Sequence, residues 1–255
     1  MKGLTDLITV CVVHPDMLSD GWVLSDDYEG ATGDTLYGLP YLRDIYVKAL
    51  PDISGRVTVP VLWDKKTETI VSNESSEIIR MLNSAFNDLT GNSDDYWPES
   101  LRDDIEAVND RIYETLNNGV YRSGFATTQE AYDEAVGALF DTMDWLEDRL
   151  STHRYLMGDR ITEADWRLVP TLFRFDLVYH LHFKCNRARL IDYPNLWAYT
   201  RELYQWPGVA ETVNFDHIVR HYHFSHETIN PHRIIPTNPV IDWLAPHGRG
   251  TLKAA

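Results

Sequence analysis

Cysteine, lysine and long apolar runs are scarce in this chain, and each shortage excludes a class of protein. The 255 residues include two cysteines, Cys11 and Cys185, too few for a disulfide framework. No stretch approaches the roughly 20 apolar residues that a membrane-spanning helix needs, so we expect no membrane partner. The start at Met1 runs into a short strand-like stretch and then a polar loop instead of a signal peptide, which predicts a cytoplasmic location.

Lysine supplies 6 of the 23 basic residues, and 39 acidic residues bring the formal net charge to −16. Nucleic-acid phosphates would repel such a chain, so we expect no nucleic-acid partner. Two interpretations of the acidity stay open. One is an ordinary acidic cytosolic enzyme, and the other is a protein from a high-salt cytoplasm, where screening relieves self-repulsion.

The stretch from Gly55 to Arg80 carries the most information. Val57 to Trp63 is apolar and largely β-branched, which predicts a strand. Pro60 cannot donate to a sheet ladder and indicates an interrupted edge, one form of which has a cis bond. The proline ring also holds Val59 extended, so the Val59 backbone is suited to pair with an extended peptide-like ligand. An ordinary strand edge is the alternative interpretation.

A return strand and a helix follow this edge. Thr69 to Ser72 predicts the second strand, after which Glu74 and Ser75 open a helix. A helix start offers N–H groups to a carboxylate, and the Glu74 carboxylate suits an ammonium group. The unit therefore fits the amino-acid head of a γ-glutamyl moiety. Plain helix capping is the alternative for both residues.

The sequence divides into an α/β part and a helical part. A polar linker, Gly91 to Pro98, separates them, and the pattern after it is helical nearly throughout. Between Asp16 and Pro51 we expect a loop-rich insert punctuated by glycine. One apolar helix face is formed by Ile105, Val108, Ile112 and Leu116.

Two helix starts follow the linker. Thr127 with Glu130 and Thr162 with Asp165 both have capping-box spacing. Pro170 should bend or restart the helix that follows.

Several reactive-looking residues are better explained without a metal or a nucleophile. His217 and His221 have the i,i+4 spacing of metal ligands on a helix, but structural zinc needs four placed ligands, and we expect no metal site. His226 begins a sequence that lacks the second histidine of a zinc protease motif. Cys11 is expected to lie buried in a strand.

Motifs along essentially the whole chain resemble those of the glutathionyl-hydroquinone reductases, the xi class of glutathione transferases. The matching stretches are His14-Pro15, Asp20-Gly21-Trp22, Gly30 to Tyr37, Gly55 to Arg80, Asn117 to Tyr121, Arg174-Phe175-Asp176, His182 to Cys185 and Thr228 to Pro231.

The resemblance implies a thioredoxin-like α/β domain at residues 1–90 and an all-α glutathione-transferase domain at residues 98–255. Family members carry Cys-Pro-Trp-Ala at the start of their first helix, and Met1 to Asp6 resembles the end of that helix. We therefore expect an N-terminally truncated domain without its first strand and helix, in which Leu7 to Val13 is the second strand.

The resemblance also implies an activity, the glutathione-dependent reduction of glutathionyl-hydroquinones, or related aromatic thioethers, by a homodimer. The cysteine that does this chemistry is expected upstream of Met1, so this chain is expected to be inactive or nearly so. Glutathione is the implied co-substrate, and γ-glutamylcysteine replaces it if the host is a salt-loving archaeon. The alternatives are a non-catalytic thiol-binding protein and a structural fragment.

Site residues are carried over from the family by position. The residues implied to be catalytic are Tyr121, as proton donor or acceptor, and Tyr179 and Tyr222, whose hydroxyl groups stabilise a thiolate by hydrogen bonding. On the residues alone, each tyrosine is ordinary packing with a satisfied hydroxyl group. The implied glutathione-binding residues are Trp22, Arg56, Val57, Thr58, Val59, Glu74 and Ser75. The resemblance also implies a folding role for the cap at Thr162 and Asp165 and a non-catalytic position for Cys185, so these residues are kept out of the site.

Overall fold

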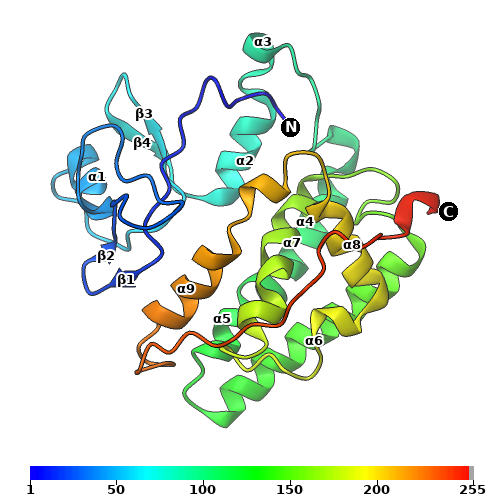
Figure 1. Cartoon of the computed structure of the whole chain (residues 1–255). Coiled ribbons are helices and arrows are strands. Elements are labelled where there is room, and N and C mark those ends of the chain that lie inside the picture. Colours follow the sequence, from blue (N-terminus) through cyan, green and yellow to red (C-terminus); the bar gives the residue numbers. More distant parts are fainter. Residues whose placement is uncertain (253–255) are drawn as a thin grey trace.

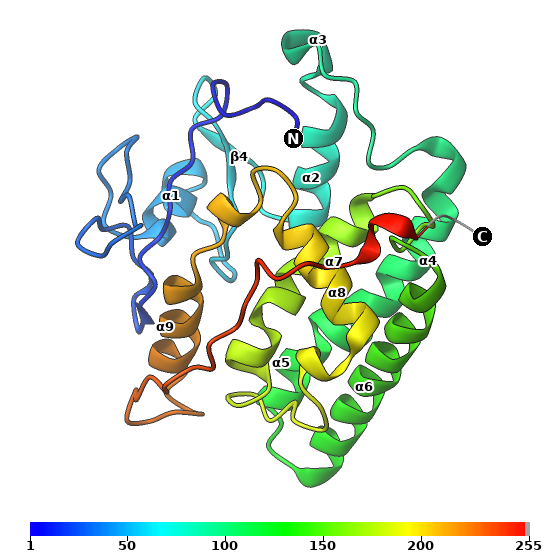
Figure 2. The ribbon, with the colours of Figure 1, turned by 45° about the vertical axis from the view of Figure 1, so that its right-hand side comes forward.

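The computed structural model describes residues 1–252 and has a small N-terminal part and a larger helical part (Figure 1). Helix α9 lies between the two parts in both views (Figures 1 and 2). The N-terminal elements are β1 (Met17–Leu18), β2 (Gly21–Trp22), α1 (Leu42–Ala49), β3 (Leu62–Asp64), β4 (Thr69–Ser72), α2 (Ser75–Ser84) and α3 (Asn87–Thr90).

The helical part begins after the linker. Its longer helices are α4 (Arg102–Ile112), α5 (Gly119–Gly124), α6 (Gln129–Thr152), α7 (Glu163–Arg174), α8 (Pro194–Tyr204) and α9 (Phe215–Ser225). Two π-helical turns, η2 (Tyr113–Asn117) and η3 (Phe175–Tyr179), continue α4 and α7. Short 3₁₀ turns are η1 (Glu99–Leu101), η4 (Leu190–Asp192), η5 (Ala210–Thr212) and η6 (Arg249–Thr251).

The main core belongs to the helical part. Helix α6 packs on α5 and α8, and α4 packs on α7. The predicted apolar face is confirmed, because Ile105, Val108, Ile112 and Leu116 are all buried in this core. The proposed domain limits, 1–90 and 98–255, stay a prediction, and the last three residues lie outside the described part. No helix of residues 1–252 is both long and apolar enough to cross a membrane.

The expected insert between Asp16 and Pro51 is more ordered than predicted. It contains the β1–β2 hairpin and α1. Leu42, Ile45 and Tyr46 are the buried positions of α1, at the i, i+3, i+4 spacing of an amphipathic helix. They form a second, smaller core with Trp22, Val57 and Trp63 packed against it.

The strand predicted over Val57 to Trp63 is too long, because β3 begins at Leu62. Pro60 has no N–H to donate, and the peptide bond before it is cis. The return strand is confirmed as β4, which pairs antiparallel with β3. The edge ahead of β3 is thus left without a strand partner, as the proline indicated.

The strand expected over Leu7 to Val13 is wrong. The segment is irregular, and its end is tied to loops: Val12 exchanges hydrogen bonds with Thr32, and the N–H of His14 donates to the carbonyl of Val23 at 2.9 Å. An apolar stretch becomes a strand only where a neighbouring strand satisfies its backbone, and among the described residues none lies beside it.

Two helix predictions need correction. Thr128, not Thr127, caps α6, with its side chain accepting from the N–H of Ala131. Of the two outcomes expected at Pro170, a restart is wrong, because α7 continues without interruption to Arg174, and a bend stays a prediction. The capping box of Thr162 and Asp165 is present as predicted.

Candidate functional site

The exposed edge before Pro60 is held by α1. The hydroxyl of Tyr46 donates to the carbonyl oxygen of Thr58 at 2.9 Å and accepts from the N–H of Thr58 at 3.3 Å. Asn73 donates to the Tyr46 hydroxyl at 3.1 Å and to Oγ1 of Thr58 at 3.3 Å. The Tyr46 hydroxyl therefore pairs with both backbone hydrogen-bonding groups of Thr58, whereas Val59 is 39% exposed. Of the other predicted residues here, Arg56 is exposed and Val57 half-buried.

Glu74 and Ser75 stand at the start of α2, as predicted. Glu74 is the N-cap residue, but its side chain makes no capping hydrogen bond and is exposed. The Ser72 hydroxyl instead accepts from the N–H of Glu74 at 3.1 Å and donates to Glu77 at 2.8 Å. The plain capping interpretation thus fails for the Glu74 side chain. The first-turn N–H groups of a helix have no acceptor within the helix itself, so those of α2 are suited to a ligand carboxylate.

Trp22 connects this edge to the helical part. It packs on the same small core as Val57, and its ring stacks on His221 of α9 with centroids 4.7 Å apart and planes at 17°. His221 is the neighbour of Tyr222, and their ring centroids lie 5.3 Å apart. The structure thereby brings one predicted glutathione-binding residue close to a predicted catalytic one.

The three predicted catalytic tyrosines form one hydrogen-bonded chain, although they come from α5, η3 and α9. The Tyr222 hydroxyl lies 2.5 Å from that of Tyr121 and 3.0 Å from that of Tyr179. Tyr179 and Tyr222 are buried, whereas Tyr121 is 39% exposed. The two hydrogen bonds between the three hydroxyl groups use two of their three protons. If Tyr179 donates to Tyr222 and Tyr222 donates to Tyr121, the remaining proton is that of the exposed Tyr121 hydroxyl.

Burial keeps the inner two phenols protonated. It raises the pKa of Tyr179 well above its usual value, and the neighbouring Tyr222 raises it further. Burial likewise raises the pKa of Tyr222. Arg174 acts in the opposite direction on both, because a cation favours the phenolate. Both phenols therefore keep their protons at neutral pH.

Neither cysteine sulfur forms a hydrogen bond with the hydroxyl groups of the tyrosine chain. Cys11 is exposed, which corrects the expectation of a buried strand residue, and its sulfur lies 3.1 Å from Oγ1 of Thr35. Cys185 is buried, and burial raises the pKa of its thiol to about 12. The thiolate is the nucleophilic form of cysteine, so burial makes Cys185 a poor nucleophile.

The histidines serve as packing and hydrogen-bonding groups. The Nε2 of His217 lies 2.6 Å from the carbonyl of Glu29, and Nδ1 of His221 lies 2.9 Å from the carbonyl of Pro15. His182 and His226 lie 3.1 Å apart, between Nε2 and Nδ1. The i,i+4 pair thus fastens α9 to the N-terminal segment, each ring through a backbone carbonyl.

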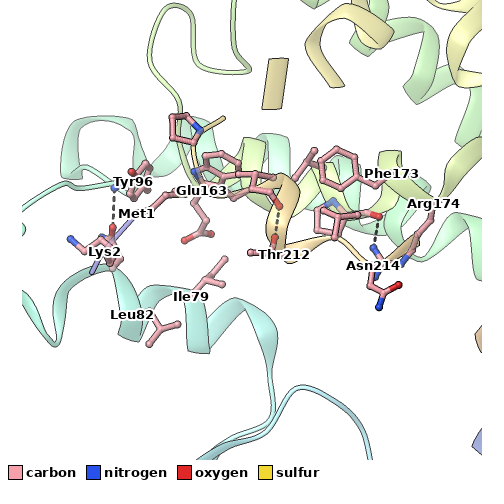
Figure 3. Close-up of a pocket in the computed structure, with 18 of the residues that line it drawn as sticks. Met1, Lys2, Ile79, Leu82, Tyr96, Glu163, Phe173, Arg174, Thr212 and Asn214 are labelled. Carbon is pink, nitrogen blue, oxygen red and sulfur yellow. Dashed lines mark hydrogen bonds between the residues drawn. The ribbon is translucent and has the colours of Figure 1, made fainter. Parts of the chain in front are cut away.

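A cavity of about 660 Å³ lies between α2, α7 and the segment before α9. Figure 3 shows Ile79 and Leu82 of α2 across from Phe173 and Arg174 of α7. The predicted site residues do not line it. Arg174 lines this cavity, and its positive charge also lowers the pKa of Tyr179 and Tyr222.

Sequence reasoning missed the residues that support the site. The prediction of a loop-rich insert does not include the helix that carries Tyr46, although the spacing of Leu42, Ile45 and Tyr46 is typical of one helix face. Asn73, which precedes the predicted helix, is not among the predicted site residues. His221 was noticed for a metal spacing that its actual contacts do not use.

Comparison with known proteins agrees with this architecture. The family profile for the glutathione S-transferase N-terminal domain matches residues 2–85, and that for the C-terminal domain matches residues 129–202. The chain is 57% identical to glutathionyl-hydroquinone reductase YqjG of Escherichia coli over 249 residues, covering 98% of this chain and 76% of that protein. It is 52% identical to glutathionyl-hydroquinone reductase PcpF of Sphingobium chlorophenolicum, with 94% and 76% covered.

Solved structures place the backbone in the same family. The glutathione-bound structure of Escherichia coli YqjG superposes with a TM-score of 0.97 at 56% identity, covering 98% of this chain and 81% of that one. A xi-class glutathione transferase from Natrialba magadii gives 0.95 at 50% identity, with 97% and 76% covered. The N-terminal part is thus thioredoxin-like and the helical part a glutathione-transferase C-terminal domain. The chain belongs to the glutathionyl-hydroquinone reductases, the xi class of the glutathione transferase family.

Proposed function

We propose that this site serves the glutathione-dependent reduction of glutathionyl-hydroquinones to hydroquinones. The observation that carries the proposal is the tyrosine chain of Tyr121, Tyr222 and Tyr179, joined through His221 to Trp22. The names of the two reductase relatives support it over the alternative of a non-catalytic thiol-binding protein.

In the proposed reaction a thiolate attacks the glutathionyl sulfur, and the bond between that sulfur and the hydroquinone ring breaks. The ring carbon takes a proton, for which the exposed Tyr121 hydroxyl is the donor. The two sulfurs are left as a mixed disulfide with glutathione. A second glutathione thiolate then displaces the first thiolate and leaves as glutathione disulfide. The net change is oxidation of two glutathionyl sulfurs and reduction of the ring carbon.

The residues divide between the two halves of the substrate. Glu74 suits the γ-glutamyl ammonium, the first turn of α2 at Ser75 its carboxylate, and the Val59 backbone the peptide part. Trp22 and Arg56 flank this edge. We assign stabilisation of the thiolate to Tyr179 and Tyr222, whose O–H groups turn from the tyrosine chain to the anion when it binds, because hydrogen bonds to an anion favour its charged form.

The test uses glutathionyl-menadione with the 255-residue chain. Since neither the exposed Cys11 nor the buried Cys185 forms a hydrogen bond with the hydroxyl groups of the tyrosine chain, we expect calorimetry to detect binding of glutathione and of glutathionyl-menadione, with little or no release of menadiol. Rapid release that Cys11→Ser abolishes would identify Cys11 as the nucleophile and contradict the expected inactivity. Failure to bind either ligand would refute the proposed function.

Two finer points belong to the same proposal. The acidic, lysine-poor composition supports γ-glutamylcysteine as an alternative thiol, and titration with both thiols tests it; a clear preference for glutathione counts against it. We also propose a cytoplasmic homodimer. Light scattering of the purified chain gives the oligomeric state, and a monomer at micromolar concentration would contradict it.

A further inference from the structure

One face of α9 contacts the segment that carries β1 and β2. Arg220 makes two hydrogen bonds of 2.7 Å to the carboxylate of Asp16. The Ser225 hydroxyl accepts from the N–H of Met17 at 2.9 Å. Because α9 also carries Tyr222, this face fixes the position of the N-terminal hairpin relative to the tyrosine chain.

Within this face, His221 alone among the described residues combines a stack on Trp22 with a bond to the hairpin backbone. Its Nδ1 donates to the carbonyl of Pro15 at 2.9 Å, and its ring lies flat against the Trp22 indole. Burial lowers the pKa of His221, so the ring is neutral at pH 7. The hydrogen bond sets the plane of the imidazole, and the imidazole in turn sets the plane of the indole.

We propose that His221 is a positioning residue for the thiol ligand: it orients the Trp22 ring, and thereby the glutathione site, against the tyrosine chain. The inference rests on the proposed function, since it assigns to His221 an effect on ligand binding that acts only through Trp22. His221 itself takes no proton from the substrate and touches no reacting atom in this role.

His217 provides the matched comparison. It lies one turn earlier on α9 and bonds a loop carbonyl in the same way, that of Glu29, with 2.6 Å between Nε2 and oxygen. Its aromatic neighbour is Tyr28 rather than Trp22. If fastening the loop to α9 were all that mattered, the two histidines would be equivalent.

The experiment is a double-mutant cycle on the dissociation constant of glutathione, measured by calorimetry. We expect His221→Ala to weaken binding by about tenfold, from the lost stack and the misplaced indole. In a Trp22→Ala background, His221→Ala should change the dissociation constant by less than about twofold, because the effects of coupled residues are not additive. His217→Ala should leave the dissociation constant unchanged.

Two milder variants separate the contacts and guard against misfolding. His221→Phe keeps a flat ring but has no donor for Pro15, and His221→Asn keeps a donor but no ring; each should lose part of the affinity, with thermal unfolding reporting the fold. Equal effects of His221→Ala with and without Trp22, or of His221→Ala and His217→Ala, would overturn the inference alone. A wild-type chain that binds no glutathione would overturn the proposed function and the inference with it.

Discussion

At the scale of single residues, the polar groups that can bind a ligand are those without a hydrogen-bond partner in the fold. The Tyr46 hydroxyl bonds both backbone groups of Thr58, whereas the carboxylate of Glu74 is exposed and uncommitted to capping. A group that is satisfied within the fold gains little from a ligand, because the hydrogen bond is only exchanged. The ligand contacts we assign therefore fall on Val59 and Glu74.

Replacing Glu74 should separate ligand binding from stability. We expect Glu74→Gln to weaken glutathione binding by about tenfold, the loss of one charge-assisted hydrogen bond to the γ-glutamyl ammonium. The melting temperature should not change, because the side chain makes no cap bond. N-acetyl-glutathione, which has no ammonium, is the control ligand. If the variant lost affinity equally for both ligands, Glu74 would not be the ammonium partner.

Gly124 is a residue whose missing side chain matters. A methyl group there would lie 2.2 Å from Cδ1 of Phe183, and Phe183 stacks on Tyr179 with centroids 5.5 Å apart. We expect Gly124→Ala to cost about 2 kcal/mol of unfolding free energy through overpacking. Gly137→Ala, in open space on α6, should instead stabilise by about 0.5–1 kcal/mol. Urea unfolding measures both, and similar effects would contradict the packing argument.

At the scale of elements, the start of α7 is fixed more firmly than its capping motif alone suggests. Asp165 is fully buried. Its carboxylate accepts from the N–H of Leu156 at 2.9 Å, from the N–H of Thr162 at 2.8 Å and from the hydroxyl of Tyr199 at 2.8 Å. One side chain thus joins α7 to the preceding loop and to α8.

Removing that carboxylate should therefore lower the unfolding free energy by more than removing an ordinary helix cap does. We expect Asp165→Ala to lower the unfolding free energy by about 3 kcal/mol or more, because several buried donors lose their acceptor. Thr128→Ala, which removes the single exposed cap bond of α6, should cost about 1 kcal/mol. Chemical denaturation compares the two variants, and equal losses would show that the added contacts of Asp165 contribute nothing.

At the scale of the whole molecule, the buried His182 and the half-buried His226 make stability depend on pH. They lie where the end of α9 meets the loop after η3. Burial, reinforced by neighbouring histidines, lowers the pKa of His182 to about 3 and that of His226 to about 4. In the unfolded chain histidine binds its proton near pH 6.5. Below that pH the unfolded state holds more protons, so stability falls as the pH falls from 6.5 toward 4.

This linkage predicts a measurable slope. Between pH 6.5 and pH 5 the unfolding free energy should fall by at most about 1.4 kcal/mol per pH unit for each such histidine. His182→Gln combined with His226→Gln should flatten the slope, while His232→Gln, at an exposed position, should not alter it. Urea titrations at several pH values give the slopes, and an unchanged slope in the double variant would contradict the assignment.

Local sequence determined the features whose partners are close along the chain. The capping box spans Thr162 to Asp165, the β4 strand and the α2 start follow one another, and the buried face of α4 repeats within two turns. Such elements are specified by groups a few residues apart, whose contact costs little chain entropy. The error at Leu7 to Val13 shows the limit, since an apolar pattern does not identify the strand that must lie beside it.

The site itself was decided by tertiary structure. The hydroxyl groups of Tyr121 and Tyr222 meet across 101 residues, and no spacing in the sequence predicts that contact; the family resemblance alone suggested it. The i,i+4 spacing of His217 and His221 predicted a shared helix face correctly, but not that this face would bind the hairpin of Trp22. The sequence by itself determined the family, the charge and the local caps. Only the packing of α9 between the two parts decided which side chains share the site, because contacts between distant segments depend on how whole elements bury their surfaces together.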